Sequence, residues 1–121
     1  MQSAPKPDIV RRYFAAYVAK DRELVDDLLT DDFSFTSPRD DAIDKAAYFA
    51  RCWPNSARIR TLAVEKVFAQ GSEAFVLYKI TTEEGTEFCN TEFWTFAGER
   101  ISRITVYFGA SYKDGAFVKE E

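Results

Sequence analysis

The spacing of apolar residues predicts two helices at the start of the chain. From residue 8 to residue 18, apolar side chains recur every three or four positions, which is typical of an amphipathic helix. Pro7 is favourable as its first residue, because proline lacks the N–H that a first helical turn leaves unpaired. Asp21 is a typical N-cap for a second, shorter helix, whose apolar positions continue to Leu29.

A short strand and a third helix are predicted next. Residues 33–37 alternate between apolar and polar side chains, and Pro38 ends this strand because proline cannot donate to a sheet ladder. Residues 39–44 form an acidic turn. Asp41 in this turn could cap a third helix, which runs to Trp53 and ends at the proline that follows.

From residue 58 the pattern changes to strict alternation, which predicts long strands separated by glycine-containing turns. The expected strands are 58–69, 73–83, 86–97 and 100–108. Because such short turns join only antiparallel neighbours, we expect a strongly curved antiparallel sheet. Helices that cover one face of such a sheet make an α+β domain, with a pocket between the helices and the concave face. We assign residues 8–110 to this single domain, residues 1–7 to an N-terminal tail, and residues 111–121 to a C-terminal tail that frays or packs on a partner.

Composition narrows the class of function. The chain has 11 Phe, 6 Tyr and 2 Trp, so either the core is unusually aromatic or some rings line a cavity. The absence of histidine excludes Ser-His-Asp and Cys-His nucleophile systems and His-ligated zinc. A net charge of −4 argues against nucleic-acid binding, and no apolar run approaches the ~18 residues of a membrane span. With no secretory signal at its start, we expect a soluble, cytoplasmic protein with Cys52 and Cys89 as free thiols.

Two stretches of the sequence resemble a known group of domains. The first is VRRYFAAY at residues 10–17 with LLTDDF at residues 28–33, and the second is NTEFWTF at residues 90–96 with the strand 100–108. Both resemble SnoaL-like and ketosteroid-isomerase-like domains of the nuclear-transport-factor-2-like superfamily, over residues 8–110. The resemblance implies a cone-shaped, curved antiparallel sheet wrapped around the long N-terminal helix, a cystatin-like α+β roll. It leaves the chemistry open, because this superfamily holds isomerases, cyclases, hydrolases, dehydratases and proteins without activity.

The resemblance also implies where a catalytic site would lie. Ketosteroid isomerases carry a tyrosine on the first helix, an aspartate base before the proline that ends the first strand, and an acid on a central strand. The matching residues in this sequence are Tyr13, Ser37 and Glu92. Serine without a neighbouring histidine or lysine cannot abstract a carbon-bound proton, so steroid-type isomerisation lacks its base here.

Glu92 is a candidate catalytic residue from its position alone. In the strand 86–97 it shares one face with Phe88, Asn90 and Trp94. A carboxylate among these rings would lose its hydration, which raises its pKa and lets it act as a proton donor or general base. If the same face is exposed to solvent instead, Glu92 would pair with an arginine such as Arg60 or Arg103.

These observations lead to two functional hypotheses. The first is a pocket protein for a small apolar or aromatic, carbonyl-bearing ligand, in which Glu92 and Tyr13 could carry isomerase, cyclase or lyase chemistry without a cofactor. Residues that we expect to contact the ligand are Tyr17, Phe35, Ser37, Phe49, Trp53, Asn90, Trp94, Val106 and Phe108. The acidic residues lack the spacing of a calcium loop, so no metal ion is expected.

The second hypothesis is a non-catalytic association domain whose own aromatic side chains fill the cavity. Domains of this superfamily commonly pair through the outer face of the sheet. In this chain Arg103, Thr105 and Tyr107 would contribute to that face, opposite Ile104, Val106 and Phe108, and the protein would be a homodimer.

Overall fold

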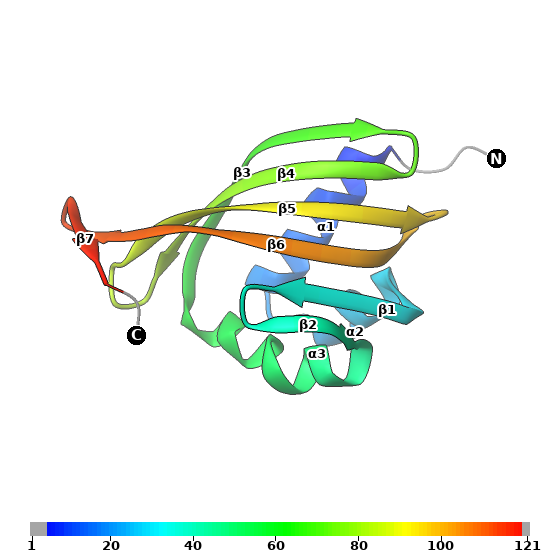
Figure 1. The fold of residues 1–121 in the computed structure, drawn as a ribbon, viewed down its shortest axis with the longest axis horizontal. Coiled ribbons are helices and arrows are strands. Elements are labelled where there is room, and N and C mark those ends of the chain that lie inside the picture. Colours follow the sequence, from blue (N-terminus) through cyan, green and yellow to red (C-terminus); the bar gives the residue numbers. More distant parts are fainter. Residues whose placement is uncertain (1–4, 120–121) are drawn as a thin grey trace.

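Four long, antiparallel strands make the curved body of the computed structural model, which describes residues 5–119 (Figure 1). They are β3 (Ile59–Gln70), β4 (Glu73–Thr82), β5 (Glu87–Ala97) and β6 (Arg100–Lys113). Two strands from the first half of the chain, β1 (Leu29–Ser37) and β2 (Asp40–Asp44), extend the sheet, in the order β2-β1-β6-β5-β4-β3. The predicted α+β fold is confirmed.

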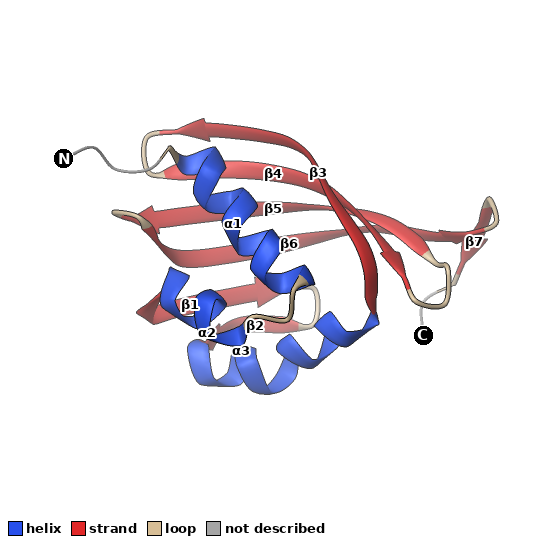
Figure 2. Cartoon of the chain, turned by 180° about the vertical axis from the view of Figure 1, so that it is seen from behind, coloured by secondary structure: helices blue, strands red, loops and turns tan. Residues whose placement is uncertain are grey.

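The helices lie on one face of this sheet, as the sequence predicted (Figure 2). They are α1 (Lys6–Val18), α2 (Arg22–Leu28), α3 (Lys45–Arg51) and a short 3₁₀ helix, η1 (Trp53–Arg58). The apolar stripe of α1 is buried against the concave side of the sheet. Asp21 caps α2 by accepting a hydrogen bond from the Leu24 backbone N–H. None of the helices within residues 5–119 is both long and apolar enough to cross a membrane.

The sheet is mixed, and not purely antiparallel as the sequence predicted. β1 runs parallel to β6, with Phe35 beside Ile104. The reasoning from short turns applies only to strands that follow each other directly. β1 and β6 are separated by α3 and by the other long strands, so no turn length sets their relative direction.

The predicted start of the third helix was wrong. Asp41 lies in β2, and the helix is capped by Asp44, whose side chain accepts a hydrogen bond from the Ala47 backbone N–H. Residues 40–44 pair with the end of β1 in a hairpin, with Phe35 opposite Ile43. This pairing gives the acidic segment a place at the edge of the sheet, which its composition did not indicate.

The predicted C-terminal tail was also wrong. β6 continues to Lys113, and β7 (Ala116–Val118) folds back against it. Asp114 and Gly115 have φ angles of 51° and 79° at the turn, the left-handed region that a two-residue hairpin turn requires. The Asp-Gly pair was therefore the sequence signal for this hairpin. At the other end, α1 begins at Lys6, and residues 1–4 of the predicted N-terminal tail lie outside the described part of the chain.

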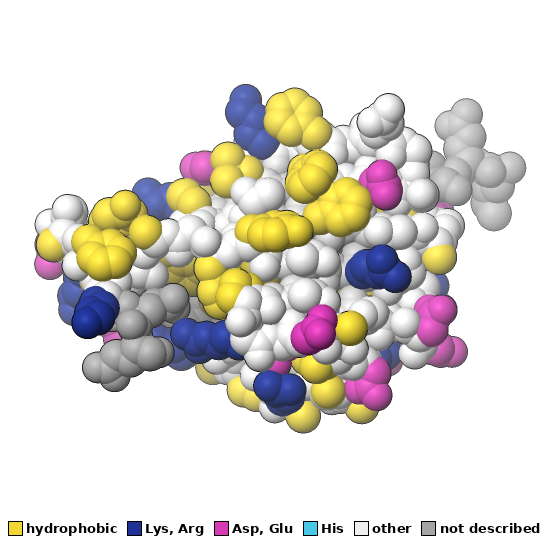
Figure 3. All heavy atoms as spheres, in the orientation of Figure 1, with side chains coloured by type: hydrophobic (Ala, Val, Ile, Leu, Met, Phe, Trp, Pro, Cys, Tyr) yellow, Lys and Arg dark blue, Asp and Glu magenta, His cyan; other side chains and the backbone are white. Residues whose placement is uncertain are grey.

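Apolar side chains gather on the outward face of the sheet over β3 to β6 (Figure 3). The strand register places Phe68 opposite Phe75 and Phe75 opposite Phe93, and the rings of Phe75 and Phe93 lie 4.8 Å apart. We call Phe68, Phe75, Phe93 and Tyr107 the outer aromatic patch. Phe68 is 69% exposed, Tyr107 57% and Phe75 50%, so this patch is much more exposed than the core.

Candidate functional site

A cavity of about 610 Å³ lies between α1, α3 and the concave face of the sheet. Its position agrees with the pocket that the sequence predicted. Buried residues from six elements form its inner part, and they are Tyr13, Phe14, Phe35, Tyr48, Tyr78, Ile80, Thr82, Asn90, Glu92 and Val106. Exposed residues, three arginines among them, form its mouth.

Glu92 points into the cavity from the middle of β5. Alternation along β5 turns Asn90, Glu92 and Trp94 toward the helices, and Glu92 is only 6% exposed. Its carboxylate accepts hydrogen bonds from the Tyr78 hydroxyl at 2.5 Å and from Trp94 Nε1 at 2.8 Å. Burial raises the pKa of Glu92 from 4.5 to about 7, and these two hydrogen bonds lower it only in part. The carboxyl group therefore titrates near neutral pH.

No arginine neutralises Glu92 among the described contacts. Arg60 donates instead to the backbone carbonyls of Thr82 and Glu83, and Arg103 is exposed. The alternative in which Glu92 lies on a solvent face beside one of these arginines is overturned by its burial.

A chain of hydrogen bonds leads from the backbone of β6 to Glu92. The Gly109 N–H donates to Asn90 Oδ1 at 3.1 Å, and Asn90 Nδ2 donates to the Tyr78 hydroxyl at 3.2 Å. Tyr78 in turn donates to Glu92. Each member fixes the orientation of the next, so the carboxylate is held in place relative to the cavity.

Tyr78 was not found by the sequence analysis. It lies on the inward face of β4, directly opposite Asn90 on β5. Alternation indicated that its side chain could point inward. Only the register between the two strands brings its hydroxyl to Glu92, and a single sequence does not determine that register.

Two further tyrosines meet in the cavity wall. The hydroxyls of Tyr13 on α1 and Tyr48 on α3 are hydrogen-bonded to each other, and both side chains are buried. Burial raises the pKa of each phenol well above its usual value, so both remain neutral hydroxyl groups that can donate hydrogen bonds. Tyr17, one turn beyond Tyr13, donates to the Cys52 backbone carbonyl at 3.5 Å. The sequence predicted Tyr13 and Tyr17 and missed Tyr48.

The position where the resemblance implied a base holds Ser37, and a carboxylate from the next strand lies beside it. Ser37 Oγ donates to Asp40 Oδ2 at 3.2 Å, and Asp40 also lines the cavity. Asp40 also forms an ion pair with Arg51, in which Asp40 Oδ1 lies 2.6 Å from a guanidinium nitrogen. Sequence reasoning placed Asp40 in an acidic turn and gave it no role, because the β1–β2 hairpin that brings it next to Ser37 was not predicted.

Eight of the residues predicted to form the site line the cavity. They are Tyr13, Tyr17, Phe35, Ser37, Asn90, Glu92, Val106 and Phe108. Phe49, Trp53 and Trp94 do not line it. The ring of Phe49 lies against the Arg22 guanidinium, Trp53 packs edge-on against Tyr17, and Trp94 is fully buried behind Glu92. Each of these three rings packs against a tyrosine that lines the cavity: Phe49 against Tyr48, Trp53 against Tyr17 and Trp94 against Tyr13.

The family profile of the SnoaL-like domain matches residues 10–104, which is most of the chain. The chain belongs to the SnoaL-like family. No curated protein matches the sequence. The family match agrees with the resemblance carried by the first helix and by the strand around Glu92, and that prediction is confirmed.

Solved structures place this SnoaL-like domain in the nuclear-transport-factor-2-like fold. A proposed ketosteroid isomerase from Kribbella flavida is 21% identical, with a TM-score of 0.74 over 88% of this chain and 78% of that one. A proposed polyketide cyclase from Sinorhizobium meliloti is 22% identical, with a TM-score of 0.70 over 88% and 99%. A protein of ketosteroid isomerase-like fold from Catenulispora acidiphila, crystallised with trimethylamine, is 14% identical, with a TM-score of 0.72 over 87% and 88%. At these identities the likeness shows the fold, and the chemistry must be argued from the cavity itself.

Proposed function

We propose that this SnoaL-like domain binds a small apolar or aromatic ligand with a carbonyl group, and that Glu92 moves a proton on that ligand. The observation that carries the proposal is a buried carboxyl group in the cavity wall with a pKa of about 7. A group that titrates near neutral pH can both take up and release a proton there. The cavity of about 610 Å³ lies within the roughly 300–1,000 Å³ that small-molecule sites occupy. The trimethylamine complex of the Catenulispora protein also supports a small-molecule class of ligand.

The arrangement suits a proton shift next to a carbonyl group. Ionised Glu92 would take a proton from the carbon beside the carbonyl, and the negative charge that develops on the carbonyl oxygen would accept a hydrogen bond from Tyr13 or Tyr48. Protonated Glu92 would then return the proton to another carbon, which gives an isomerase. If a leaving group instead departs from the neighbouring carbon with its bonding electrons as the new double bond forms, protonated Glu92 would give the proton to that leaving group, which gives a lyase. Ser37 cannot take part as a base, so Glu92 would serve in both steps.

We expect a carbonyl-bearing ligand to stabilise the protein and to exchange its acidic C–H proton in a Glu92-dependent way. Thermal unfolding against steroids, polyketide-like aromatics, terpenoids and fatty acids identifies the class. A ligand at a hundred times its Kd should add about 2.7 kcal/mol, or roughly 10 °C in a domain of this size. Deuterium uptake by the hit, followed by NMR, should fall by about a hundredfold or more in Glu92→Gln.

Glu65→Gln is the matched control, because Glu65 is an exposed residue of β3 outside the cavity. It should leave both stabilisation and deuterium uptake unchanged. A ligand that stabilises the protein but exchanges no proton would limit the function to binding. A panel without any stabilising compound would contradict the proposal altogether.

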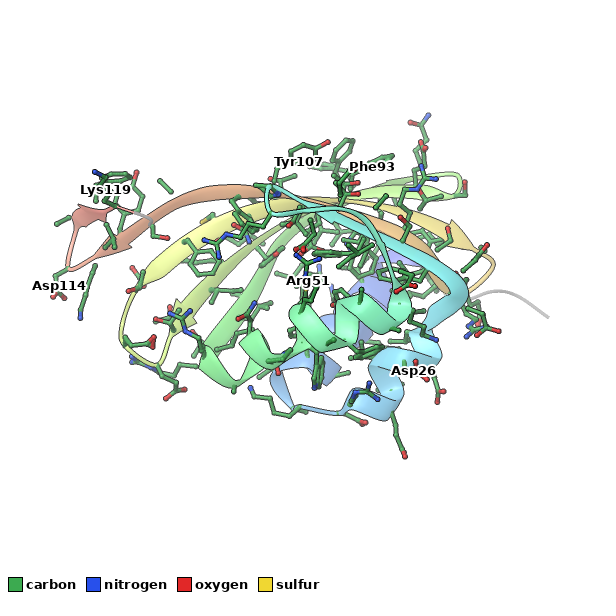
Figure 4. The ribbon with its side chains drawn as sticks, turned by 60° about the horizontal axis from the view of Figure 1, so that its bottom comes forward. Asp26, Arg51, Phe93, Tyr107, Asp114 and Lys119 are labelled. Atoms are coloured by element: carbon green, nitrogen blue, oxygen red, sulfur yellow. The ribbon has the colours of Figure 1, made fainter. Side chains whose placement is uncertain are left out.

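A second candidate function is association, which the outer aromatic patch favours. Contiguous exposed aromatic side chains on a sheet face are a common mark of a protein–protein interface. Phe93 and Tyr107 point away from the helices and the cavity (Figure 4), so pairing through this face would leave the cavity open. The hypothesis also expected the protein's own rings to fill the cavity, and the volume of about 610 Å³ favours an open cavity instead.

If the protein forms a homodimer through this patch, Phe75→Glu should dissociate it. Because a two-fold interface brings each patch against its copy, the substitution would place two carboxylates in one apolar contact. Sedimentation should give twice the chain mass of 13.9 kDa for the wild type and the single-chain mass for Phe75→Glu. Phe117→Glu makes the same change at an exposed ring of β7 and should remain dimeric. A wild type that sediments as a monomer would contradict association through this face.

A further inference from the structure

Three arginines line the mouth of the cavity in a chain whose net charge is −4. Arg39 comes from the turn between β1 and β2, Arg51 from the end of α3, and Arg58 from the end of η1, and all three line the cavity. The acidic residues in the described lining are Asp40 at the mouth and Glu92 inside. Arg58 also forms an ion pair with the exposed Glu84, and Arg51 forms one with Asp40.

Arg51 is held in place but remains accessible. Its guanidinium contacts Asp40 at 2.6 Å, and the Asp40 side chain is itself only 9% exposed and accepts hydrogen bonds from Ser37 and Cys52. The Arg51 side chain is 56% exposed. It extends from α3 toward the inner side of the sheet (Figure 4). A guanidinium carries five N–H donors, so one that orients itself on Asp40 retains donors for a second carboxylate.

The inner part of the cavity has the opposite character. Its wall there is made mainly of buried apolar residues and neutral phenols, including Phe14, Phe35 and Tyr48, with Asn90 and Glu92 among its polar side chains. At the mouth, the Arg39 guanidinium lies 6.0 Å from the ring centre of Phe108. A ligand that satisfies both ends must combine an apolar body with an anionic group at one end.

We propose that the ligand is an amphiphilic carboxylic acid, whose apolar body lies among the inner rings and whose carboxylate binds Arg51 at the mouth. A planar guanidinium matches the two oxygens of a carboxylate better than those of any neutral group. The inference rests on the proposed function, and it narrows the ligand class from carbonyl compounds in general to keto acids.

Calorimetric titration with three probes of one shape tests this inference. The probes are naphthylacetate, its methyl ester and naphthylethylamine, and the proteins are the wild type, Arg51→Gln and Arg11→Gln. We expect the acid to bind the wild type about tenfold more tightly than the ester, because only the acid brings a negative charge and two equivalent acceptor oxygens to the guanidinium. Arg51→Gln should remove this preference. Arg11→Gln makes the same change on the exposed side of α1, outside the cavity, and should keep it.

Arg51→Lys is a second variant, needed because Arg51→Gln removes the ion-pair partner of Asp40 and could unfold the protein. It keeps the positive charge but not the planar fork, so it should retain only part of the preference for the acid. Equal binding of acid and ester by the wild type, or tighter binding of the amine, would overturn the inference and leave the proposed function standing. Binding of none of the probes, together with a flat ligand panel, would overturn the proposed function and this inference with it.

Discussion

Gly109→Ala is expected to lower the free energy of unfolding by about 2–3 kcal/mol. A Cβ atom at this position would lie 1.9 Å from the Cys89 carbonyl oxygen and 3.0 Å from its carbonyl carbon. Both are backbone atoms of β5, so no side chain can move to relieve the clash. The two strands would have to separate at the register shift between Phe88 and Asn90. Urea denaturation followed by circular dichroism measures the loss.

The neighbouring residue provides a control for this prediction. Ala110→Ser adds one atom at an exposed position of the same strand and should stay within about 0.5 kcal/mol of the wild type. Because the Gly109 N–H holds Asn90, which positions Tyr78, the alanine variant should also bind the ligand more weakly. An unfolding midpoint equal to that of the wild type would show that the strands accommodate a methyl group, against the geometry described here.

Glu92 is expected to make stability fall as pH rises between about 4.5 and 7. In the unfolded chain the carboxyl group ionises near 4.5, whereas burial raises its pKa in the folded protein to about 7. Between these values the folded state binds a proton that the unfolded state has released, so each rise in pH favours unfolding. The contribution of Glu92 is thus fully present below pH 4.5 and is lost as pH rises through 7. The difference between a pKa of 4.5 in the unfolded chain and one of about 7 in the folded protein corresponds to about 3 kcal/mol of unfolding free energy.

The difference between wild type and Glu92→Gln isolates this effect from the many exposed carboxyl groups. Urea denaturation across this pH range should show the wild type losing about 3 kcal/mol more than the variant. Glu92→Gln should be somewhat less stable than the wild type at acid pH, because the amide nitrogen cannot accept the hydrogen bond from Tyr78 or Trp94. Glu65→Gln should follow the wild-type curve. Parallel curves for the wild type and Glu92→Gln would mean that Glu92 is ionised in the folded protein.

The elements that the sequence predicted well are those whose signal is local. The apolar spacing of α1 and the alternation of β3 to β6 depend only on nearby residues, and these elements agree with the prediction apart from the longer end of β6. The elements that it missed depend on pairing between distant segments. Residues 40–44 become a strand only because β1 lies beside them. β1 runs parallel to β6 because α3 and η1 carry the chain to the opposite edge of the sheet, and the strands from β3 to β6 then lead back to β1.

The candidate site divides in the same way. Alternation along β5 was sufficient to place Glu92 and Asn90 on one face, and helical spacing was sufficient to turn Tyr13 toward the sheet. These two patterns did not distinguish residues that line the cavity from residues that pack against its lining. Phe49, Trp53 and Trp94 have the apolar character of lining residues. Only the packing of the helices and strands decides that they do not line the cavity.

The sequence by itself therefore determined the α+β class, the family and the side chains that share a face with Glu92 on β5. The tertiary structure decided that this face is buried. Only the tertiary structure decided what that carboxyl group meets. The contacts of Glu92 with Tyr78, of Tyr13 with Tyr48 and of Arg51 with Asp40 join different elements of the fold. Hydrogen bonds and ion pairs form only over a few ångströms, and strand register and helix packing set such distances. A repeat of two or 3.6 residues determines which side chains share a face, but it does not determine which residues those side chains contact.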